Sequence, residues 1–227
     1  YLEKHREVGA MCVSRPTNPT GNVLTNDEIR HLSALAYKYN IPLFVDNAYG
    51  LPFPNIIFTE DAKPYWDSSV ILSMSLSKIG LPSLRTGIVV AKPELIKALA
   101  SVNSIVALAS GSLGQVISQD LFATGKMKTL AESYVRPFYQ QKSLFAQSCF
   151  KEFFAGTNYS VHKSEGAIFN WILMNDLKIP TKELYVKLKD QGVITVPGEY
   201  FFFGTPEHEH YDKCLRINYS RPEDEVR

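Results

Sequence analysis

The chain has little cysteine, and its cysteines show no pairing pattern. Cys12, Cys149 and Cys214 are the only three among 227 residues, they are widely scattered, and no CxxC spacing occurs. An odd, scattered set argues against a disulfide framework. It predicts reduced thiols, mainly buried in packing roles, in a cytoplasmic protein.

Strong net charge and long hydrophobic runs are also lacking. The formal net charge of +1 gives no electrostatic reason to expect nucleic acid or an anionic membrane as a partner. No apolar stretch approaches the roughly 20 residues of a membrane span, and no signal peptide opens the chain. A content of 45% hydrophobic and 21% charged residues is typical of a globular protein with an ample core.

Neither end of the chain reads as a natural terminus. The first residue is Tyr1, and Pro222 followed by acidic residues is typical of a helix that would start just before Arg227. We therefore expect a piece of a longer protein, cut at both ends.

The first half of the chain predicts an α/β fold with a mostly parallel sheet. Apolar runs predict strands over 10–14, 41–45, 70–74 and 85–91, and a helix is expected over 94–100. Thr25 to Glu28 form a capping-box sequence, and apolar residues at helical spacing continue to Tyr39, with Asn40 able to close the helix. A strand, a helix and a strand in succession imply parallel pairing through a right-handed crossover.

From residue 111 onward the pattern becomes helical and then alternates. Helices are expected over 112–124 and 126–154, with a kink or break at Pro137. Further strands are expected over 159–163, 167–174, 193–196 and 214–219, and a helix over 183–191. The organisation predicted is a large α/β domain over 1–125, a connecting long helix over 126–155 and a smaller α+β domain over 156–227.

Polar side chains follow three of the predicted strands. Asn18 follows the first strand, Asp46 and Tyr49 follow the second, and Lys78 follows the third. Open α/β sheets bind ligands at the carboxyl ends of their strands. An amine, an acid and a phenol at one edge indicate a carbonyl cofactor held as a Schiff base.

Two other interpretations of local motifs are weaker. Ser75 to Lys78 also fit the Ser-x-x-Lys of acyl-enzyme hydrolases, but the Ser-Asp-Asn and Lys-Thr-Gly that accompany it there are absent. His208 and His210 could ligate a metal, but an exposed polar loop is the favoured interpretation, and no metal is expected.

In combination, the motifs resemble those of the class I/II aminotransferases, which are pyridoxal-phosphate enzymes of fold type I. The similarity is strongest to the valine–pyruvate aminotransferase family and runs from about residue 9 to residue 219. It rests on SRPTNPTG at 14–21, DNAYG at 46–50, SLSKIGLP at 75–82, EGAIF at 165–169 and VPG at 196–198.

The resemblance implies catalytic roles for Lys78, Asp46 and Tyr49. Lys78 would form the internal aldimine with pyridoxal 5'-phosphate and, once freed, would move the proton during transfer. Asp46 would keep the pyridine nitrogen protonated. Tyr49 would hydrogen-bond the phenolic oxygen of the cofactor.

Binding roles are implied for four more residues. Asn18 would contact the same phenolic oxygen and the substrate. Ser75 and Arg85 would bind the 5'-phosphate, since a guanidinium can donate two parallel hydrogen bonds to it. Arg216 would clamp the α-carboxylate of the substrate.

The resemblance also implies what would lie outside the chain. The family's phosphate-binding loop and the aromatic residue that stacks on the cofactor come before the position of Tyr1, so the large domain would lack its N-terminal part. The last helix of the small domain would be missing too.

The activity implied is ping-pong transamination between valine or alanine and a 2-oxo acid, pyruvate or 2-oxoisovalerate, by a homodimer. Two alternatives stay open. A carbon–sulfur lyase of the same fold type would share the same residues, and a ligand-sensing regulator would carry a DNA-binding domain upstream.

Overall fold

The structure is a computed structural model that describes residues 1–226. The chain divides into two compact units. The first consists of residues 1–17 and 23–137, and the second consists of residues 18–22 and those from 138 onward. The short segment 18–22 therefore belongs with the C-terminal unit, although it lies near the start of the chain.

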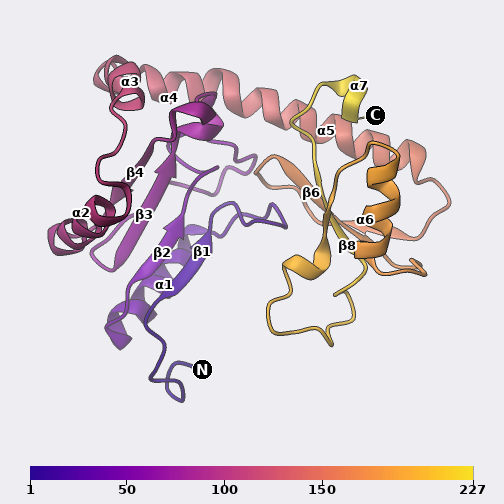
Figure 1. Ribbon diagram of the computed structural model, residues 1–227, viewed down its shortest axis with the longest axis horizontal. Coiled ribbons are helices and arrows are strands. Elements are labelled where there is room, and N and C mark those ends of the chain that lie inside the picture. Colours follow the sequence, from indigo (N-terminus) through magenta and orange to yellow (C-terminus); the bar gives the residue numbers. More distant parts are fainter. Residues whose placement is uncertain (227) are drawn as a thin grey trace. The chain divides into compact units, whose positions relative to one another are not determined.

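The first unit is built on a four-stranded mixed sheet (Figure 1). Its strands, in spatial order, are β1 (Met11–Ser14), β2 (Leu43–Asp46), β3 (Val70–Ser75) and β4 (Gly87–Val90). The first three pair in parallel, and β4 runs antiparallel to β3. The predicted α/β character is confirmed, and the antiparallel edge strand makes the sheet mixed.

Helix α1 (Asn26–Tyr39) forms the crossover between β1 and β2. Both halves of the predicted capping box are present, because Thr25 Oγ1 accepts the Glu28 N–H and the Glu28 carboxylate accepts the Thr25 N–H. Asn40 ends the helix in the left-handed region, at φ 52°. Ala36 is fully buried against the apolar side chains of β2 and β3, which form the core of this unit.

The helices after β4 differ in detail from those predicted. They are α2 (Pro93–Ala107), α3 (Leu113–Ala123), α4 (Lys126–Leu130) and α5 (Arg136–Phe153). The single helix predicted over 126–154 is interrupted by a π-helical turn over Ala131–Val135, just before Pro137. Proline has no N–H to donate and crowds the preceding turn, so the irregularity falls one turn earlier than predicted.

The second unit contains a four-stranded antiparallel sheet (Figure 1). Its strands, in spatial order, are β5 (Tyr159–Val161), β6 (Phe169–Met174), β8 (Cys214–Asn218) and β7 (Val196–Pro197). Helix α6 (Thr181–Asp190) precedes β7, and the short α7 (Glu223–Val226) follows β8. The strand predicted over 193–196 is mostly wrong: β7 covers only Val196–Pro197, and Val193 and Ile194 are exposed and lie outside the ladder.

Cysteine placement differs in part from the prediction. All three cysteines are free, and Cys149 and Cys214 are buried as predicted, but Cys12 is exposed. Within residues 1–226, no group of three or more His, Cys, Asp or Glu side chains could hold a metal ion. The same part of the chain contains no helix long and apolar enough to cross a membrane.

Candidate functional site

The carboxyl ends of the parallel strands lie side by side and place Asp46 at the edge of the sheet. In the ladder, Asp46 is the partner of Ser14 on one side and of Ser73 on the other. The Asp46 carboxylate is exposed, and its Oδ1 accepts the N–H of Ala48 at 3.1 Å. Asp46 therefore lies at the end of β2, and the hydrogen bond from the Ala48 N–H orients its carboxylate.

The turn that follows Asp46 is tightly packed. A Cβ on Gly50 would lie 1.9 Å from Asn47 Oδ1 and 2.5 Å from the Arg15 carbonyl oxygen, so only glycine fits there. The Tyr49 carbonyl accepts the N–H of Ile56 at 2.9 Å. This packing holds the backbone of Tyr49 in one conformation.

Lys78 and Tyr49 face each other in the first unit. Lys78 lies in a 3-10 turn over Leu76–Ile79. Ser75 caps the start of this turn, because its Oγ accepts the Ser77 N–H at 3.1 Å. The Lys78 Nζ lies 5.4 Å from the centroid of the Tyr49 ring, and both side chains are half-buried. An amine and a phenol are thus brought together beside the strand end that carries Asp46.

Ser75 ends β3, and Lys78 and Arg85 lie in the connection between β3 and β4. The Leu76 N–H donates to the Thr86 carbonyl at 3.1 Å, which ties the two ends of this connection together. Arg85 was predicted to open a strand, and this is wrong: it follows a 3-10 turn over Pro82–Leu84 at φ 48°, and β4 begins at Gly87. Its exposed guanidinium lies 3.5 Å from the Pro82 carbonyl, at the long limit of a hydrogen bond.

Asn18 and Arg216, which are 198 positions apart in the sequence, are hydrogen-bonded within the second unit. Arg216 Nη1 donates to Asn18 Oδ1 at 2.8 Å. The loop that carries Asn18 is anchored at Gly21, whose carbonyl accepts the Glu165 N–H at 3.2 Å. Gly21 has φ +75°, and a Cβ there would lie 3.0 Å from the Gly166 carbonyl oxygen. Two of the motifs found in the sequence, at 14–21 and 165–169, therefore pack against each other.

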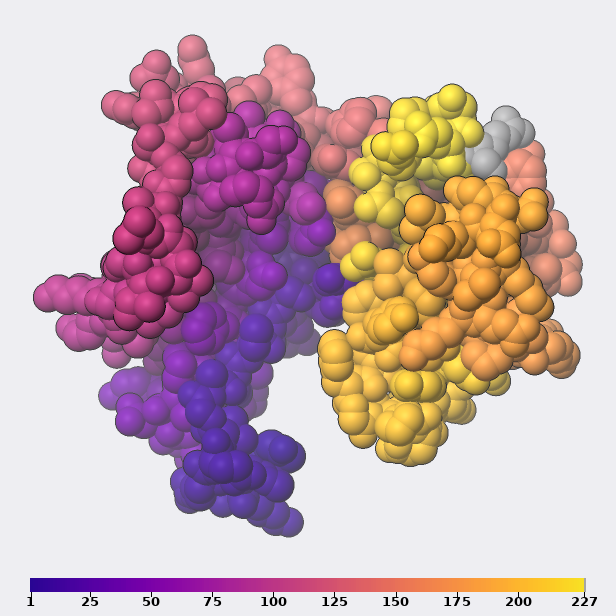
Figure 2. Space-filling model, in the orientation of Figure 1, coloured from indigo at the N-terminus to yellow at the C-terminus, as the bar shows by residue number. Residues whose placement is uncertain are grey.

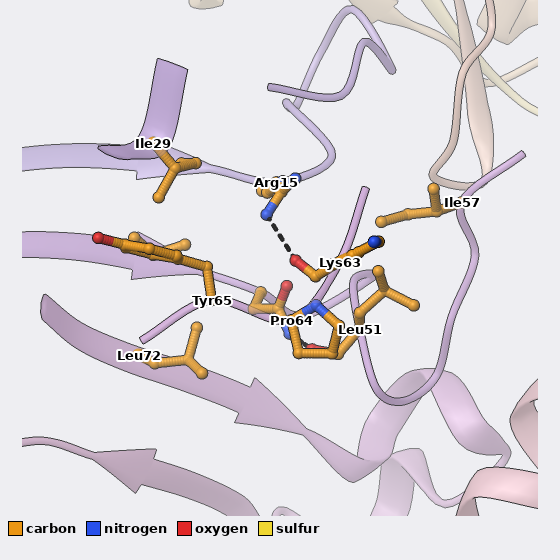
Figure 3. Close-up of a pocket in the computed structure, with 10 residues that line it drawn as sticks. Arg15, Ile29, Leu51, Ile57, Lys63, Pro64, Tyr65 and Leu72 are labelled. Carbon is orange, nitrogen blue, oxygen red and sulfur yellow. Dashed lines mark hydrogen bonds between the residues drawn. The ribbon is translucent and has the colours of Figure 1, made fainter. Parts of the chain in front are cut away.

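Arg15 is a residue that the sequence interpretation missed. It is 4% exposed, and its guanidinium donates to the Lys63 carbonyl at 3.1 Å and to Asn26 Oδ1 at 2.6 Å. Figure 3 shows the side chain pointing toward Lys63, beside a cavity of about 10 Å³. Its position directly after an apolar strand was the only signal in the sequence that could have indicated burial.

Burial lowers the pKa of the Arg15 guanidinium, because leaving water disfavours the charged form, and the negative charge of Glu28 opposes this shift. Its Nε has no hydrogen-bond partner. A cavity of this size has room for about one water molecule. Arg15 therefore ties the start of the 14–21 motif to α1 and to the loop at Lys63, and its role is structural.

The residues present fit a carbonyl cofactor that carries a phosphate. Five of the seven predicted site residues lie in the first unit, where Asp46 ends β2, Tyr49 follows it, and the other three lie at the end of β3 or in the connection to β4. They supply one amine, one carboxylate, one phenol, one hydroxyl and one guanidinium. The other two, Asn18 and Arg216, are paired in the second unit and supply donors suited to a carboxylate.

Comparison with known protein families gives one match over almost the whole chain. Residues 2–227 match the family "Aminotransferase class I and II". A curated relative, the valine–pyruvate aminotransferase of Escherichia coli strain K12, is 44% identical over 220 residues, which are 96% of this chain and 52% of that protein.

Solved structures and a more distant relative extend the comparison. The crystal structure of valine–pyruvate aminotransferase from Salmonella typhimurium LT2 superposes with a TM-score of 0.91 and 44% identity, over 97% of this chain and 57% of that one. The HTH-type transcriptional regulator NorG of Staphylococcus aureus is 27% identical over 213 residues, which are 91% of this chain and 45% of the regulator. The chain spans about half the length of the curated relatives that it matches.

Proposed function

Because the chain belongs to the class I and II aminotransferase family, we propose that the protein of which it forms part transfers an α-amino group with the help of pyridoxal 5'-phosphate. The amino donor would be valine or alanine, and the acceptor would be pyruvate or 2-oxoisovalerate. The observation that carries the proposal is the Lys78 amine facing the Tyr49 ring at 5.4 Å, beside the strand end that presents Asp46.

When bound, the cofactor supplies an aldehyde for the amino group and an aromatic ring that withdraws electrons from the substrate α-carbon. Lys78 holds the cofactor through its amine and, when released, moves a proton to and from the α-carbon as a general base and acid. The half-buried position of Lys78 limits the motion of its long side chain. The short 3-10 turn over Leu76–Ile79, which Ser75 caps, fixes the backbone position of Lys78.

Asp46 and Tyr49 tune the cofactor from the end of β2. The Asp46 carboxylate would favour a protonated ring nitrogen through its negative charge. The Tyr49 hydroxyl would donate a hydrogen bond to the phenolic oxygen. Ser75 and Arg85 bind the phosphate, the first through its hydroxyl and the second through its paired N–H donors.

Arg216 binds the α-carboxylate of the amino acid, and Asn18 holds one of its terminal nitrogens. Their hydrogen bond of 2.8 Å supports this assignment, because it orients the guanidinium from one side. The 44% identity to two valine–pyruvate aminotransferases supports valine, alanine and pyruvate as substrates.

We also propose how this chain would fit in the whole protein. Residues 1–125 would form the C-terminal part of the large cofactor-binding domain, 126–155 the connecting helix, and 156–227 the small domain. The whole protein would act as a homodimer in the cytoplasm. The relatives, which are about twice as long as this chain, support the view that it is part of a longer protein.

A trapping experiment on the whole protein tests the cofactor site. Purified protein should absorb visible light, and borohydride should fix the cofactor on one peptide, the one that contains Lys78. Lys78→Ala should abolish both signals. The matched control is Lys97→Ala, which changes an exposed lysine on α2. A label on another lysine would contradict the proposal.

A product assay separates transfer from the lyase alternative. An aminotransferase releases at most one 2-oxo acid per cofactor, and no ammonia, unless an acceptor is present, whereas a lyase continuously releases pyruvate and ammonia from a sulfur amino acid alone. Acceptor-independent ammonia would therefore favour the lyase. The regulator alternative is supported by the similarity to NorG. It predicts cofactor binding without turnover.

A further inference from the structure

We infer that Phe201 and Phe169 are positioning residues for the Arg216 guanidinium. In this view the aromatic rings, together with Asn18, set the direction in which Arg216 presents its N–H donors to a carboxylate. The inference rests on the proposed function, because it takes Arg216 as the group that receives the substrate α-carboxylate.

The contacts of Arg216 come from three separate segments. Its Cζ lies 5.0 Å from the Phe169 ring centroid and 5.3 Å from the Phe201 ring centroid. Both distances are inside the range of about 6 Å for a cation–π interaction. Its Nη1 donates to Asn18 Oδ1 at 2.8 Å. The guanidinium is therefore flanked by two aromatic rings and hydrogen-bonded to Asn18.

The sheet of the second unit brings Phe169 to Arg216. Strands β6 and β8 are antiparallel, and Trp171 is the ladder partner of Arg216. Phe169 lies two residues before Trp171, so both rings stand on one face of β6. Phe169 is 2% exposed, which means that its ring has little freedom to move away.

Phe201 reaches the same place from a short turn that packs tightly on β8. The turn spans Gly198–Tyr200, and the Phe201 N–H donates to the Gly198 carbonyl at 2.8 Å. A Cβ on Gly198 would lie 2.7 Å from the Cys214 Cβ, so glycine allows the turn to approach the strand. The Phe201 ring packs edge-to-face on Trp171, with centroids 5.5 Å apart and an interplanar angle of 89°. The ring that flanks Arg216 is thus itself braced.

This arrangement matters because arginine has a long and flexible side chain. A carboxylate is bound best when two parallel N–H groups of a guanidinium point at its two oxygens. Rings that flank the guanidinium remove rotamers that would turn this donor edge away, so that less conformational entropy is lost on binding. Loss of the Phe201 ring should weaken binding of every α-carboxylate to the same degree, whatever its side chain.

A different role for Phe201 makes a different prediction. If the ring only forms a wall of the side-chain pocket, its removal should change the preference between valine and alanine. If it only supports the fold, its removal should lower stability without a selective effect on substrate affinity. The pattern across ligands therefore distinguishes the three roles.

The test uses the whole protein with its cofactor and four variants. Phe201→Leu and Phe201→Met remove the ring but keep an apolar side chain, and Phe201→Tyr keeps the ring. Phe203→Leu is the matched control, because Phe203 belongs to the same aromatic run but is 85% exposed. KM and kcat are measured with valine and with alanine, using 2-oxobutanoate as acceptor. The dissociation constant of isovalerate, a carboxylate without an amino group, is measured by calorimetry.

We expect the Leu and Met variants to raise both KM values and the isovalerate dissociation constant by about 3- to 10-fold, the loss of roughly one cation–π contact. The kcat values should change less than KM. Phe201→Tyr and Phe203→Leu should stay within about twofold of the parent protein.

Three results would overturn the inference: unchanged affinities in the Leu and Met variants, a loss confined to one amino acid, or a Tyr variant as weak as the Leu variant. A parent protein that transfers no amino group would instead refute the proposed function. In that case the isovalerate series alone decides whether Phe201 positions Arg216.

Discussion

At the scale of single residues, Asp46 offers the sharpest test of the proposed chemistry. Asp46→Asn keeps an oxygen that can accept the Ala48 N–H, a bond now 3.1 Å long, but removes the negative charge. Without that charge the ring nitrogen loses its proton, and the proton-transfer step should become slower by on the order of 3–6 kcal/mol in activation free energy. Single-turnover kinetics with valine measure this step.

The control for this prediction is Asp61→Asn, which neutralises another exposed aspartate of the first unit. It should leave the single-turnover rate unchanged. Near-parental turnover in Asp46→Asn would mean that Asp46 only caps its turn.

Arg216 leads to a second prediction at this scale. Arg216→Lys keeps a positive charge but loses the planar pair of donors, and an ammonium cannot reproduce the hydrogen bond to Asn18 in the same geometry. We expect kcat/KM to fall for valine and for alanine, by an amount that corresponds to roughly 2–4 kcal/mol of lost transition-state stabilisation. The cofactor absorbance should stay unchanged. Release of the cofactor, or unaltered kinetics, would place the carboxylate site elsewhere.

Cys214 should make the folding stability of the chain depend on pH, and a substitution can isolate this effect. Burial, with a smaller effect from the Glu199 carboxylate, raises the pKa of this thiol from 9.0 to about 12. Between those values the unfolded chain loses the proton while the folded chain keeps it. Cys214 therefore stabilises the fold fully below pH 9, and this contribution is lost as the pH rises toward 12.

Urea unfolding at pH 8 and pH 10.5 measures this contribution. The parent protein should lose more stability between the two pH values than Cys214→Ala, by up to about 1.4 kcal/mol per pH unit above pH 9. Cys12→Ala, at an exposed cysteine, serves as the control and should keep the parental slope. Equal slopes in the parent and in Cys214→Ala would contradict the raised pKa.

At the scale of elements, the start of α1 is the clearest case of a sequence signal that becomes structure. Thr25→Ala removes the oxygen that accepts the Glu28 N–H at 3.2 Å and should lower the free energy of unfolding by about 1 kcal/mol. Adding Glu28→Ala should cost less than the sum of the two changes, because the two residues cap each other. Ser104→Ala, in the exposed interior of α2, is the control and should be neutral, since alanine favours a helix.

Other elements show which features local sequence patterns can predict and which they cannot. The strands β1, β2, β3, β6 and β8 were predicted within a few residues, because each contains a short apolar run bounded by polar or turn-forming residues. The π-helical turn before Pro137 and the short β7 depend on packing that no local pattern encodes. Arg85 was misplaced because its backbone adopts φ 48°, which is uncommon for a residue other than glycine.

The same contrast applies to the site. Lys78, Asp46 and Tyr49 follow apolar strands, so that the pattern alone brings them to one sheet edge. The pairing of Asn18 with Arg216 links residues 198 positions apart, and the rings around Arg216 come from β6 and from the turn before Phe201. Such long-range neighbours are set by tertiary structure and cannot be derived from spacing.

At the scale of the whole molecule, the surface of the first unit is unusually apolar over α2 and α3. Exposed side chains on these helices and the loop between them include Val102, Ile105, Val106, Leu108, Leu113 and Val116, which are 58–86% exposed. In Figure 2 this stretch, magenta to rose, forms an outer face of the first unit. Large apolar side chains exposed along one segment, as these are, favour an interaction site or an aggregation liability.

The 227-residue chain on its own should therefore behave differently from the whole protein. We expect it to self-associate and to bind the dye ANS, because the apolar side chains over α2 and α3 meet water. It should also hold the cofactor weakly and transfer amino groups slowly, since it spans about half the length of its relatives. Ultracentrifugation, ANS fluorescence and cofactor absorbance measure these properties.

A pair of substitutions tests whether the exposed apolar side chains themselves cause the self-association of the chain. Ile105→Glu with Val106→Lys places charges where the side chains are 84% and 81% exposed, and it should reduce self-association of the chain without loss of helix. The same pair of substitutions should disrupt the whole protein if other segments or a second subunit cover this face. A chain that stays monomeric, binds no dye and transfers amino groups at the rate of the whole protein would show that this surface needs no partner.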